Sequence, residues 1–150
     1  MQNLTISSPF GALTITEDAG NITKLSWSTG GTDTNPLLEE SKSQLDAYFA
    51  GTLTTFTLPL KVQGSDLQRR TCAAMQSIPF GETRTYGDLA KDLGASAQAI
   101  GQACGGNPIP IIIPCHRILG ASNLGGFSGG TGIETKVALL KHEGAASLLI

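Results

Sequence analysis

The sequence of 150 residues has little charge and few aromatic side chains. Only 15% of its residues are charged and 5% are aromatic, and ten Lys and Arg against twelve Asp and Glu give a net charge of −2. This balance excludes a histone-like or otherwise strongly basic nucleic-acid binder, but not a nucleic-acid site confined to one face. Because 40% of the residues are hydrophobic, disorder is not expected either. The length fits one or two small domains with a buried core.

Signals for secretion, membrane insertion and disulfide bonding are also lacking. The N-terminus has no basic segment followed by an apolar run, so we expect no secretory signal peptide. The longest stretch without a charge, 93–116, is as long as a membrane span, but its glycines, prolines and amides do not suit a helix facing lipid. The three cysteines, an odd number, lack the spacing of a disulfide scaffold. We therefore expect a cytoplasmic protein with reduced thiols and no membrane contact.

The few charges are distributed unevenly along the chain. Residues 1–66 carry three Lys and seven Asp or Glu, a balance of −4, whereas residues 67–150 carry seven Lys or Arg and five Asp or Glu, a balance of +2. The first part is also rich in Thr, Ser and other residues that favour strands. We therefore predict two domains, residues 1–64 and 65–150.

The first domain is predicted to combine short strands with one helix. Asn35 as N-cap and Pro36 at the first helical position predict a helix that runs to about Phe49 and stops near Gly51. The segments around it have the residue types and the flanking turns of extended chain. These predicted extended segments are 4–7, 12–16, 22–27 and 56–62.

The second domain is predicted to be helical in short pieces. Ser65 with Gln68, and Thr85 with Asp88, have the pattern of capping boxes that open helices. The helix after Thr85 is followed by a short turn with a glycine and by a second helix, which Ser96 can cap. This arrangement is typical of a helix-turn-helix, although the pattern alone also fits a plain αα-corner.

The last predicted helix covers residues 133–143. Its apolar stripe consists of Ile133, Val137 and Leu140, and Gly144 is placed to end it. The stripe predicts which side of this helix is buried.

A candidate nucleophile stands in the tetrapeptide PCHR, after an apolar run bracketed by prolines. A free thiol is mostly protonated at neutral pH, so Cys115 needs a base or a cation nearby. His116 can serve as the base, directly or through a water, and both His116 and Arg117 would favour the thiolate. Glu143 is a candidate to orient His116, and Asn107 offers an amide to hold the segment. We expect Cys115 to be functional.

The other two cysteines, Cys72 and Cys104, are expected to be inert buried residues because no base stands near them. A zinc site is a weak alternative, since Cys and His residues around Cys115 lack the usual ligand spacing and an adjacent Cys-His pair can rarely ligate one ion. We therefore expect no bound metal.

The hexapeptide IPCHRI at 113–118 resembles the active-site signature of the O6-alkylguanine-DNA alkyltransferases. The resemblance extends over about half of the chain, in the order and spacing expected of that family. The further blocks are IPFG at 78–81, TYGDLA at 85–90, GGNPIP at 105–110, FSGG at 127–130 and HEG at 142–144.

The resemblance implies a fold, a reaction and a partner. The fold is an α/β N-terminal subdomain, ribonuclease-H-like in outline, and a mainly helical, winged-helix-like C-terminal subdomain with a helix-turn-helix. The reaction is the irreversible transfer of an alkyl group from O6-alkylguanine, and potentially O4-alkylthymine, to the protein's own cysteine, once per molecule. The partner is double-stranded DNA carrying the lesion, with the target base flipped out through the minor groove. We expect a monomer without a cofactor.

The resemblance also implies roles for individual residues. Cys115 would be the nucleophile, His116 would act on it through a water, Glu143 would polarise His116, and Asn107 would hold the segment. Tyr86 would push on the phosphate 3′ to the target and hydrogen-bond the flipped base. The implied substrate-binding residues are Ser128, Gly129, Ile118, Pro110, Lys136 and Phe127. The implied DNA-binding residues are Gln98, Ala97, Ala99, Gly101, Thr85 and Arg117.

Some of these roles can be stated more closely. Ser128 would donate to O6, the carbonyl of Ile118 would accept from the exocyclic amine, and Pro110 would line the alkyl pocket. Lys136 would help to neutralise the charge that develops there. Small side chains on the second short helix suit a narrow groove, although they also suit close packing of helices.

The sequence departs from the family pattern in three places. Gln98 stands where the family usually has an arginine that enters the base stack, so we expect weaker flipping or weaker DNA binding. Phe127 stands where many members have tyrosine, which removes a hydroxyl. Some relatives bind a structural zinc in the N-terminal subdomain, but no Cys or His precedes Cys72 here, so that site is not expected.

Three other functions compete with alkyl transfer. Lesion-binding relatives without chemistry replace the nucleophile, usually by tryptophan, whereas Cys115 is present. A helix-turn-helix regulator is disfavoured by the low charge and by the absence of a basic recognition helix. A cysteine hydrolase using Cys115, His116 and Asn107 is disfavoured because such triads assemble from positions distant in the sequence.

Overall fold

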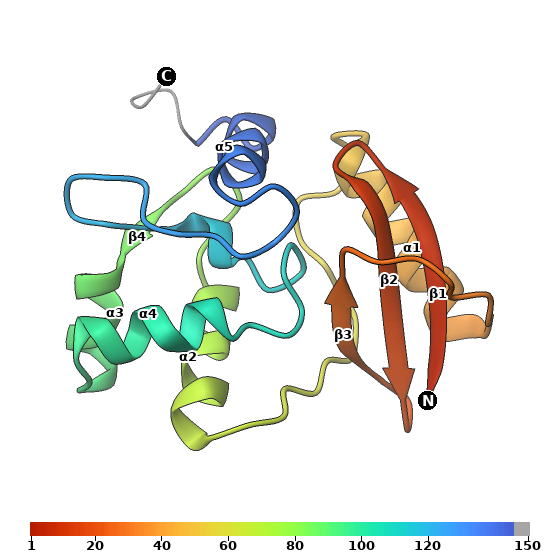
Figure 1. Ribbon diagram of the computed structural model, residues 1–150, viewed down its shortest axis with the longest axis horizontal. Helices are drawn as coiled ribbons and strands as arrows, with labels where there is room; N and C mark the ends of the chain where they lie inside the picture. The colour runs from red at the N-terminus through yellow and green to blue at the C-terminus, as the bar shows by residue number, and fades with distance from the viewer. Residues whose placement is uncertain (146–150) are drawn as a thin grey trace. The chain divides into compact units, whose positions relative to one another are not determined.

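The computed structural model describes residues 1–145, and the chain divides into two compact units, Met1–Val62 and Gln63–Ile150. The first unit holds a sheet and one helix, and the described part of the second, up to residue 145, holds four α-helices with short extended pieces (Figure 1). No helix within residues 1–145 is long and apolar enough to cross a membrane.

The sheet of the first unit is an antiparallel meander in the order β1-β2-β3. Its strands are β1 (Gln2–Ser8), β2 (Gly11–Asp18) and β3 (Asn21–Ser26), which confirms the three predicted strands. Strand β2 lies in the middle and is buried on both faces, since Leu13 and Ile15 alternate with largely buried threonines. The threonine hydroxyls are satisfied by hydrogen bonds, so polar side chains can be buried on the second face.

Helix α1 (Pro36–Phe49) packs against β1 and β2 (Figure 1). Its N-cap is confirmed, because Asn35 Oδ1 accepts a hydrogen bond of 2.9 Å from the backbone N–H of Leu38. The helix buries Leu38, Leu45 and Tyr48 completely. These side chains and the apolar face of the sheet make the core of the first unit.

The segment 56–62, predicted to be extended, forms no strand of its own. It runs beside β3 and makes one parallel bridge, between Ile22 and Leu60. The backbone N–H of Ile22 donates to the carbonyl of Pro59 at 2.8 Å, and the backbone N–H of Lys61 donates to the carbonyl of Ile22 at 3.0 Å. Proline has no N–H to donate, so a longer ladder cannot form across this position.

Three helices of the second unit pack against one another: α2 (Asp66–Gln76), α3 (Tyr86–Leu93) and α4 (Ala97–Gly105). The hydroxyl of Ser65 caps α2, but the predicted capping box there is wrong in its second half. The side-chain amide of Gln68 does not bond to the backbone of Ser65. It donates instead to the carbonyl of Ala103 at 2.7 Å and so links α2 to α4. A tertiary partner thus replaces the local one.

The predicted caps of the two short helices are confirmed. Thr85 and Asp88 form a reciprocal capping box with both hydrogen bonds at 3.0 Å. Gly94 ends α3 in the left-handed conformation at φ 66°, which glycine adopts without strain. Ser96 caps α4 by accepting from the backbone N–H of Ala99.

Four further elements belong to the described part of the second unit. They are β4 (Arg84–Thr85), the single 3₁₀ turn η1 (Cys115–Arg117), β5 (Ile118–Leu119), which pairs in parallel with β4, and α5 (Ile133–His142). Residues 111–114 are buried directly ahead of η1. The candidate nucleophile therefore follows a stiff, buried backbone.

The predicted apolar stripe of α5 is wrong at its start. Ile133 is 42% exposed, whereas Lys136, which was not part of the stripe, is completely buried. The reason is that the Lys136 ammonium finds backbone carbonyls inside the unit, so a cationic side chain occupies the inner face.

Candidate active site

A cavity of about 470 Å³ in the second unit has Cys115 in its wall. Its lining comes from α3, α4, η1 and the glycine-rich loop that precedes α5. The lining residues are Tyr86, Gly101, Cys104, Gly105, Cys115, Gly126, Phe127 and Ser128. On α4 these positions have the spacing i, i+3 and i+4, so one face of that helix is turned toward the cavity. The volume is in the range of sites for small organic ligands.

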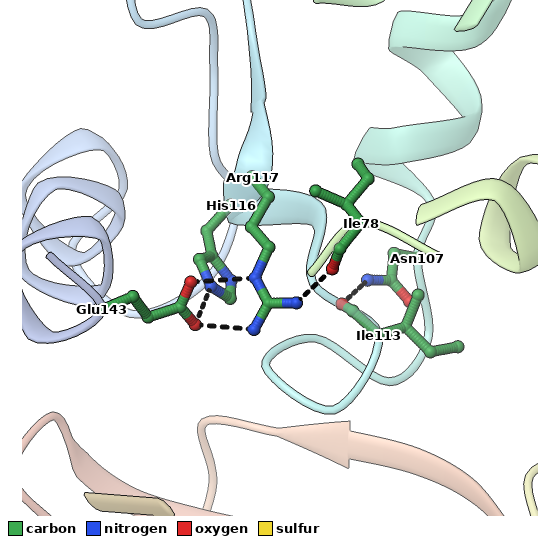
Figure 2. A network of polar contacts seen from close by, with 6 residues as sticks. All are labelled: Ile78, Asn107, Ile113, His116, Arg117 and Glu143. Carbon is green, nitrogen blue, oxygen red and sulfur yellow. Dashed lines mark hydrogen bonds and ion pairs between the residues drawn. The ribbon is translucent and has the colours of Figure 1, made fainter. Parts of the chain in front are cut away.

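Asn107 holds the chain that leads to the nucleophile. Its amide nitrogen donates to the carbonyl of Ile113 at 2.8 Å, and its amide oxygen accepts from the backbone N–H of Ile109 at 3.0 Å (Figure 2). Between them Ile111 has φ 73°, a conformation that is costly for a β-branched residue. The two bonds of one side chain thus brace a strained turn directly ahead of Cys115.

Cys115 is a protonated thiol at rest. Burial raises the pKa of Cys115 to about 11, and the Asn107 hydrogen bond and the charge of Lys136 lower it only in part. The expectation that His116 and Arg117 favour the thiolate is not met, since neither is among the groups that lower this pKa. A base must therefore take the proton as the sulfur reacts.

His116 is buried beside Glu143. Its Nε2 lies 2.7 Å from Glu143 Oε2, and both side chains are completely buried. An ionised carboxylate can only accept, so the imidazole proton lies on Nε2 and Nδ1 carries the lone pair. Burial, which outweighs the attraction of Glu143, lowers the pKa of His116 below its ordinary value. Nδ1 is buried and has no protein partner in the described part of the chain.

Arg117 is bound inside the protein. Its Nε and Nη2 donate to the two oxygens of Glu143 at 2.8 and 3.0 Å, and its Nη1 donates to the carbonyl of Ile78 at 2.6 Å (Figure 2). The residue is only 6% exposed. The predicted DNA contact of Arg117 is therefore corrected, because its guanidinium is buried and occupied by protein acceptors.

The glycine-rich loop lies against Tyr86. A Cβ added to Gly125 would lie 2.7 Å from the Tyr86 ring and 2.8 Å from its hydroxyl oxygen, so only glycine fits there. Burial raises the pKa of the Tyr86 hydroxyl, which keeps it a phenol able to donate a proton. The loop thus presses directly on a side chain of the cavity wall.

Lys136 ties this loop to β5. Its ammonium donates to the carbonyl of Ile118 at 2.6 Å and to that of Gly126 at 3.2 Å, and it lies 5.9 Å from the centroid of the Tyr86 ring. Burial lowers the pKa of Lys136 to about 8. Lys136 is outside the cavity lining, so its contribution to the site is to hold the loop and to supply charge from behind it.

The other predicted substrate-binding residues divide into two groups. Phe127 and Ser128 line the cavity, and the Ser128 hydroxyl lies 3.4 Å from a carbonyl at the end of α4. Pro110, Ile118 and Gly129 are not among its lining residues. Of these, Ile118 is completely buried in β5.

The predicted DNA-binding residues other than Arg117 lie on α3 and α4. Ala97 and Gln98 are exposed in the first turn of α4, and Ala99 and Gly101 are half-buried. Thr85 is half-buried at the N-terminus of α3, where its hydroxyl caps the helix. These residues therefore come from the two helices whose residues also line the cavity.

The sequence-based prediction missed three residues of the cavity wall. Cys104, Gly105 and Gly126 line it, whereas the sequence predicts an inert, buried Cys104. Burial raises the pKa of Cys104 to about 12, with a smaller contribution from Cys115. The spacing of Cys104 and Gly105 from Gly101 along α4 is the signal that could have revealed them.

No group of three or more His, Cys, Asp or Glu side chains suited to a metal ion is found in residues 1–145. The cysteines at 72, 104 and 115 are all free thiols. The residues gathered around Cys115 thus supply a thiol, a neutral base, a phenol and a cavity, which is a set suited to nucleophilic transfer.

Two family models together match nearly all of the chain. The model of the 6-O-methylguanine DNA methyltransferase ribonuclease-like domain matches residues 2–62, and that of the DNA binding domain of the same family matches residues 66–145. The chain belongs to the 6-O-methylguanine DNA methyltransferase family. The predicted family and the two-part architecture are thereby confirmed.

Similar proteins of this family cover nearly all of the chain. A methylated-DNA–protein-cysteine methyltransferase of Mycolicibacterium paratuberculosis is 42% identical over 158 aligned residues, covering 97% of this chain and 96% of its own. The constitutive enzyme of that name from Bacillus subtilis is 38% identical, with 93% of each chain covered.

Solved structures of family members are also similar to this one. The crystal structure of Mycobacterium tuberculosis OGT in complex with DNA has a TM-score of 0.86 at 43% identity, covering 97% of this chain and 94% of that one. An O6-methylguanine DNA methyltransferase from Methanococcus jannaschii has a TM-score of 0.69 at 26% identity, covering 94% and 93%. The whole fold, and not only the signature around Cys115, is therefore shared with the family.

Proposed function

We propose that this protein repairs DNA by transferring an alkyl group from O6 of guanine to the sulfur of its own Cys115. The observation that carries the proposal is the position of Cys115 in the cavity wall, next to the buried pair of His116 and Glu143. Family membership over nearly the full chain supports the same reaction. The transfer is a single turnover, because the thioether product does not regenerate the thiol.

The chemistry begins with a neutral thiol and a neutral imidazole. His116 Nδ1 takes the proton of Cys115 through a water while the sulfur attacks the alkyl carbon. The bond between that carbon and O6 breaks, and its electron pair stays on the guanine. The Tyr86 hydroxyl donates to a guanine ring nitrogen and so stabilises the charge that develops. Atoms and charge then balance without a cofactor.

The cavity holds the flipped base. Phe127 and Ser128 in its wall support such a site, with Ser128 and the backbone N–H of Gly129 as donors to O6. The carbonyl of Ile118 accepts from the exocyclic amine; it already accepts from Lys136, and a carbonyl oxygen has a second lone pair. Pro110 is assigned to the alkyl pocket, although it is not among the residues that line this cavity.

DNA binds across α3 and α4, which form a helix-turn-helix with β4 and β5 as a minimal wing. Helix α4 enters the minor groove, where its small residues Ala97, Ala99 and Gly101 allow close approach. Gln98 enters the base stack in place of the flipped nucleotide, and Thr85 lies near a backbone phosphate. The DNA-binding domain begins at residue 65 and the ribonuclease-like domain ends at residue 64. We expect the protein to act as a monomer.

The test is a mass measurement on the full chain after incubation with duplex DNA containing O6-methylguanine. We expect one added methyl group on the peptide that contains Cys115, and loss of the lesion from the DNA. The Cys115→Ala variant should remain unmodified. Cys104→Ala is the matched control, because it removes the other thiol of the cavity and should still be methylated.

Two outcomes would contradict the proposal. Binding of the duplex with an unmodified protein and an intact lesion would indicate a lesion-binding module. Methylation of Cys104 in place of Cys115 would show that Cys104 is the nucleophile.

A further inference from the structure

The buried cluster around His116 contains a third side chain that alkyl transfer as described does not use. Arg117 approaches Glu143 side-on and binds both carboxylate oxygens, at 2.8 and 3.0 Å. Glu143 Oε2 is shared, since it also lies 2.7 Å from Nε2 of His116. Figure 2 shows the guanidinium with one edge on Glu143 and the remaining nitrogen on the carbonyl of Ile78. Both ends of the arginine fork are therefore fixed.

This arrangement sets the direction of the Glu143 carboxylate. Glu143 is the C-cap of α5 and Arg117 is the last residue of η1, so the pair links two elements that are 26 residues apart in sequence. A side-on pair fixes the plane of a carboxylate, which a single hydrogen bond to His116 does not. The anchor on Ile78 fixes the guanidinium in turn.

We propose that Arg117 is a positioning residue, which holds the Glu143 carboxylate against Nε2 of His116 and keeps His116 a neutral base with Nδ1 free to accept the proton of Cys115. This assignment rests on the proposed function for its consequence in catalysis. The arrangement of the three side chains is independent of that function.

The charge of Arg117 affects the protonation of His116. Burial has the largest effect on His116 and lowers its pKa; Glu143 opposes this by its hydrogen bond and its charge, while Arg117 and Lys136 add to the lowering. With Arg117 present, the carboxylate is neutralised and the imidazole can stay uncharged. Without Arg117, the Glu143 carboxylate would still lie 2.7 Å from Nε2 of His116, and its charge would favour proton uptake by His116.

The other elements that pack against η1 are α2 and α5. Helix α2 also packs against η1, and the residues that it buries are Thr71, Cys72 and Met75. Its charged residues, Asp66, Arg69 and Arg70, are exposed. On α5, Lys136 is held by backbone carbonyls, Glu134 and Lys141 are exposed, and the ring of His142 lies against that of Phe80.

The test combines NMR of the histidine rings with the pH profile of transfer, both on the full chain. The chain has two histidines, so a His142→Gln variant assigns the signals of His116. In the wild type we expect a neutral ring with the proton on Nε2. In Arg117→Met we expect the doubly protonated ring at neutral pH. The pH below which the transfer rate falls should then rise by at least about one unit, and the rate at pH 7 should be reduced about tenfold.

Two further variants keep the test decisive. Arg117→Met combined with Glu143→Gln removes both charges, and we expect His116 to be neutral again, with the acid limb back at its wild-type position. Arg117→Lys keeps the charge but not the side-on pair, and we expect a mixture of the two ring tautomers and a transfer rate reduced about tenfold. If Arg117→Met does not fold, the results for Arg117→Lys and the double variant decide whether Arg117 positions Glu143 and His116.

A purely structural role would give a different result. Variants with a lower melting temperature but the wild-type tautomer and an unmoved pH profile would overturn the proposal. The NMR measurement needs no DNA, so it remains informative if the wild-type protein transfers no alkyl group. In that case the proposed function fails, and the positioning of His116 by Arg117 is judged on the ring signals alone.

Discussion

Among the single residues, burial favours the uncharged forms of Cys115 and His116, although the reaction needs a thiolate. Burial raises the pKa of Cys115 to about 11 and lowers that of His116, so both groups are uncharged at neutral pH. A thiolate–imidazolium pair stored in this cavity would be costly to desolvate. The neutral pair costs less, and it forms the nucleophile only when a substrate is in place.

The transfer rate should therefore depend on pH in a defined direction. Below the lowered pKa of His116 the imidazolium cannot accept the proton of Cys115, so the rate falls on the acid side only at a pH below 6.5, the ordinary value for histidine. Single-turnover transfer measured from about pH 5 to pH 9 checks this. An acid limb centred above pH 6.5 would mean that His116 is charged at rest.

A second prediction for a single side chain concerns the replacement of Gln98 by arginine. The Gln98→Arg variant adds a cation and a stacking plane on the exposed first turn of α4, so we expect duplex binding about fivefold tighter and faster repair. Binding titrations and single-turnover rates measure the two effects. Gln102→Arg is the control, because it adds the same charge one turn later on α4 and should tighten binding without faster repair. A Gln98→Arg variant that changes neither quantity would remove Gln98 from the interface.

At the scale of elements, the cavity is formed where the glycine-rich loop meets α3 and α4. Gly101 and Gly105 leave the facing side of α4 without bulk, and Gly125 lets the loop backbone approach Tyr86. Lys136 fixes the loop from the side of α5. The shape of the cavity thus depends on backbone approach more than on large side chains.

Gly125→Ala should impair the site without unfolding the protein. The added Cβ would overlap the Tyr86 ring, and φ 71° is unfavourable for alanine, so we expect Tyr86 to be displaced and transfer to slow by about tenfold or more. Single-turnover rates and far-ultraviolet circular dichroism separate the two effects. Gly126→Ala is the matched control, because its Cβ would meet no atom within 4 Å. Equal rates for the two variants would argue against a role for the contact with Tyr86.

At the scale of the whole molecule, the charge distribution limits how strongly DNA is attracted. The second unit carries seven Lys and Arg, but Lys136 and Arg117 are buried and bound to protein acceptors, which leaves five. Arg84 among these forms an ion pair of 2.7 Å with Asp92. Such a surface suits a protein that scans DNA for damage and does not hold one sequence tightly.

The affinity for undamaged duplex should accordingly be weak and depend moderately on salt. With at most five phosphate contacts, the logarithm of the association constant should fall with the logarithm of salt concentration with a slope no steeper than about −4.5. Fluorescence anisotropy over a salt series measures this slope. A steeper slope would show that lysines of the first unit also contact phosphates.

Features that depend on residues close together in the chain could be predicted from the amino-acid order. The cap of α1 at Asn35 and the reciprocal box of Thr85 and Asp88 were predicted correctly, because a cap needs only its own side chain and the backbone three residues on. The three strands of the sheet were likewise predicted from their own residue types and flanking turns. The family, too, followed from the order of short motifs around Cys115.

The surroundings of those motifs depend on how distant parts of the chain pack together. Arg117 is two residues from Cys115, yet its guanidinium binds Glu143, and Gln68 bonds across to α4 in place of closing its own capping box. Cys104 belongs to the cavity because α4 turns that face toward η1 and the glycine-rich loop. Adjacency in sequence fixes the backbone, but burial, side-chain direction and hence protonation are set by elements that pack from elsewhere in the chain.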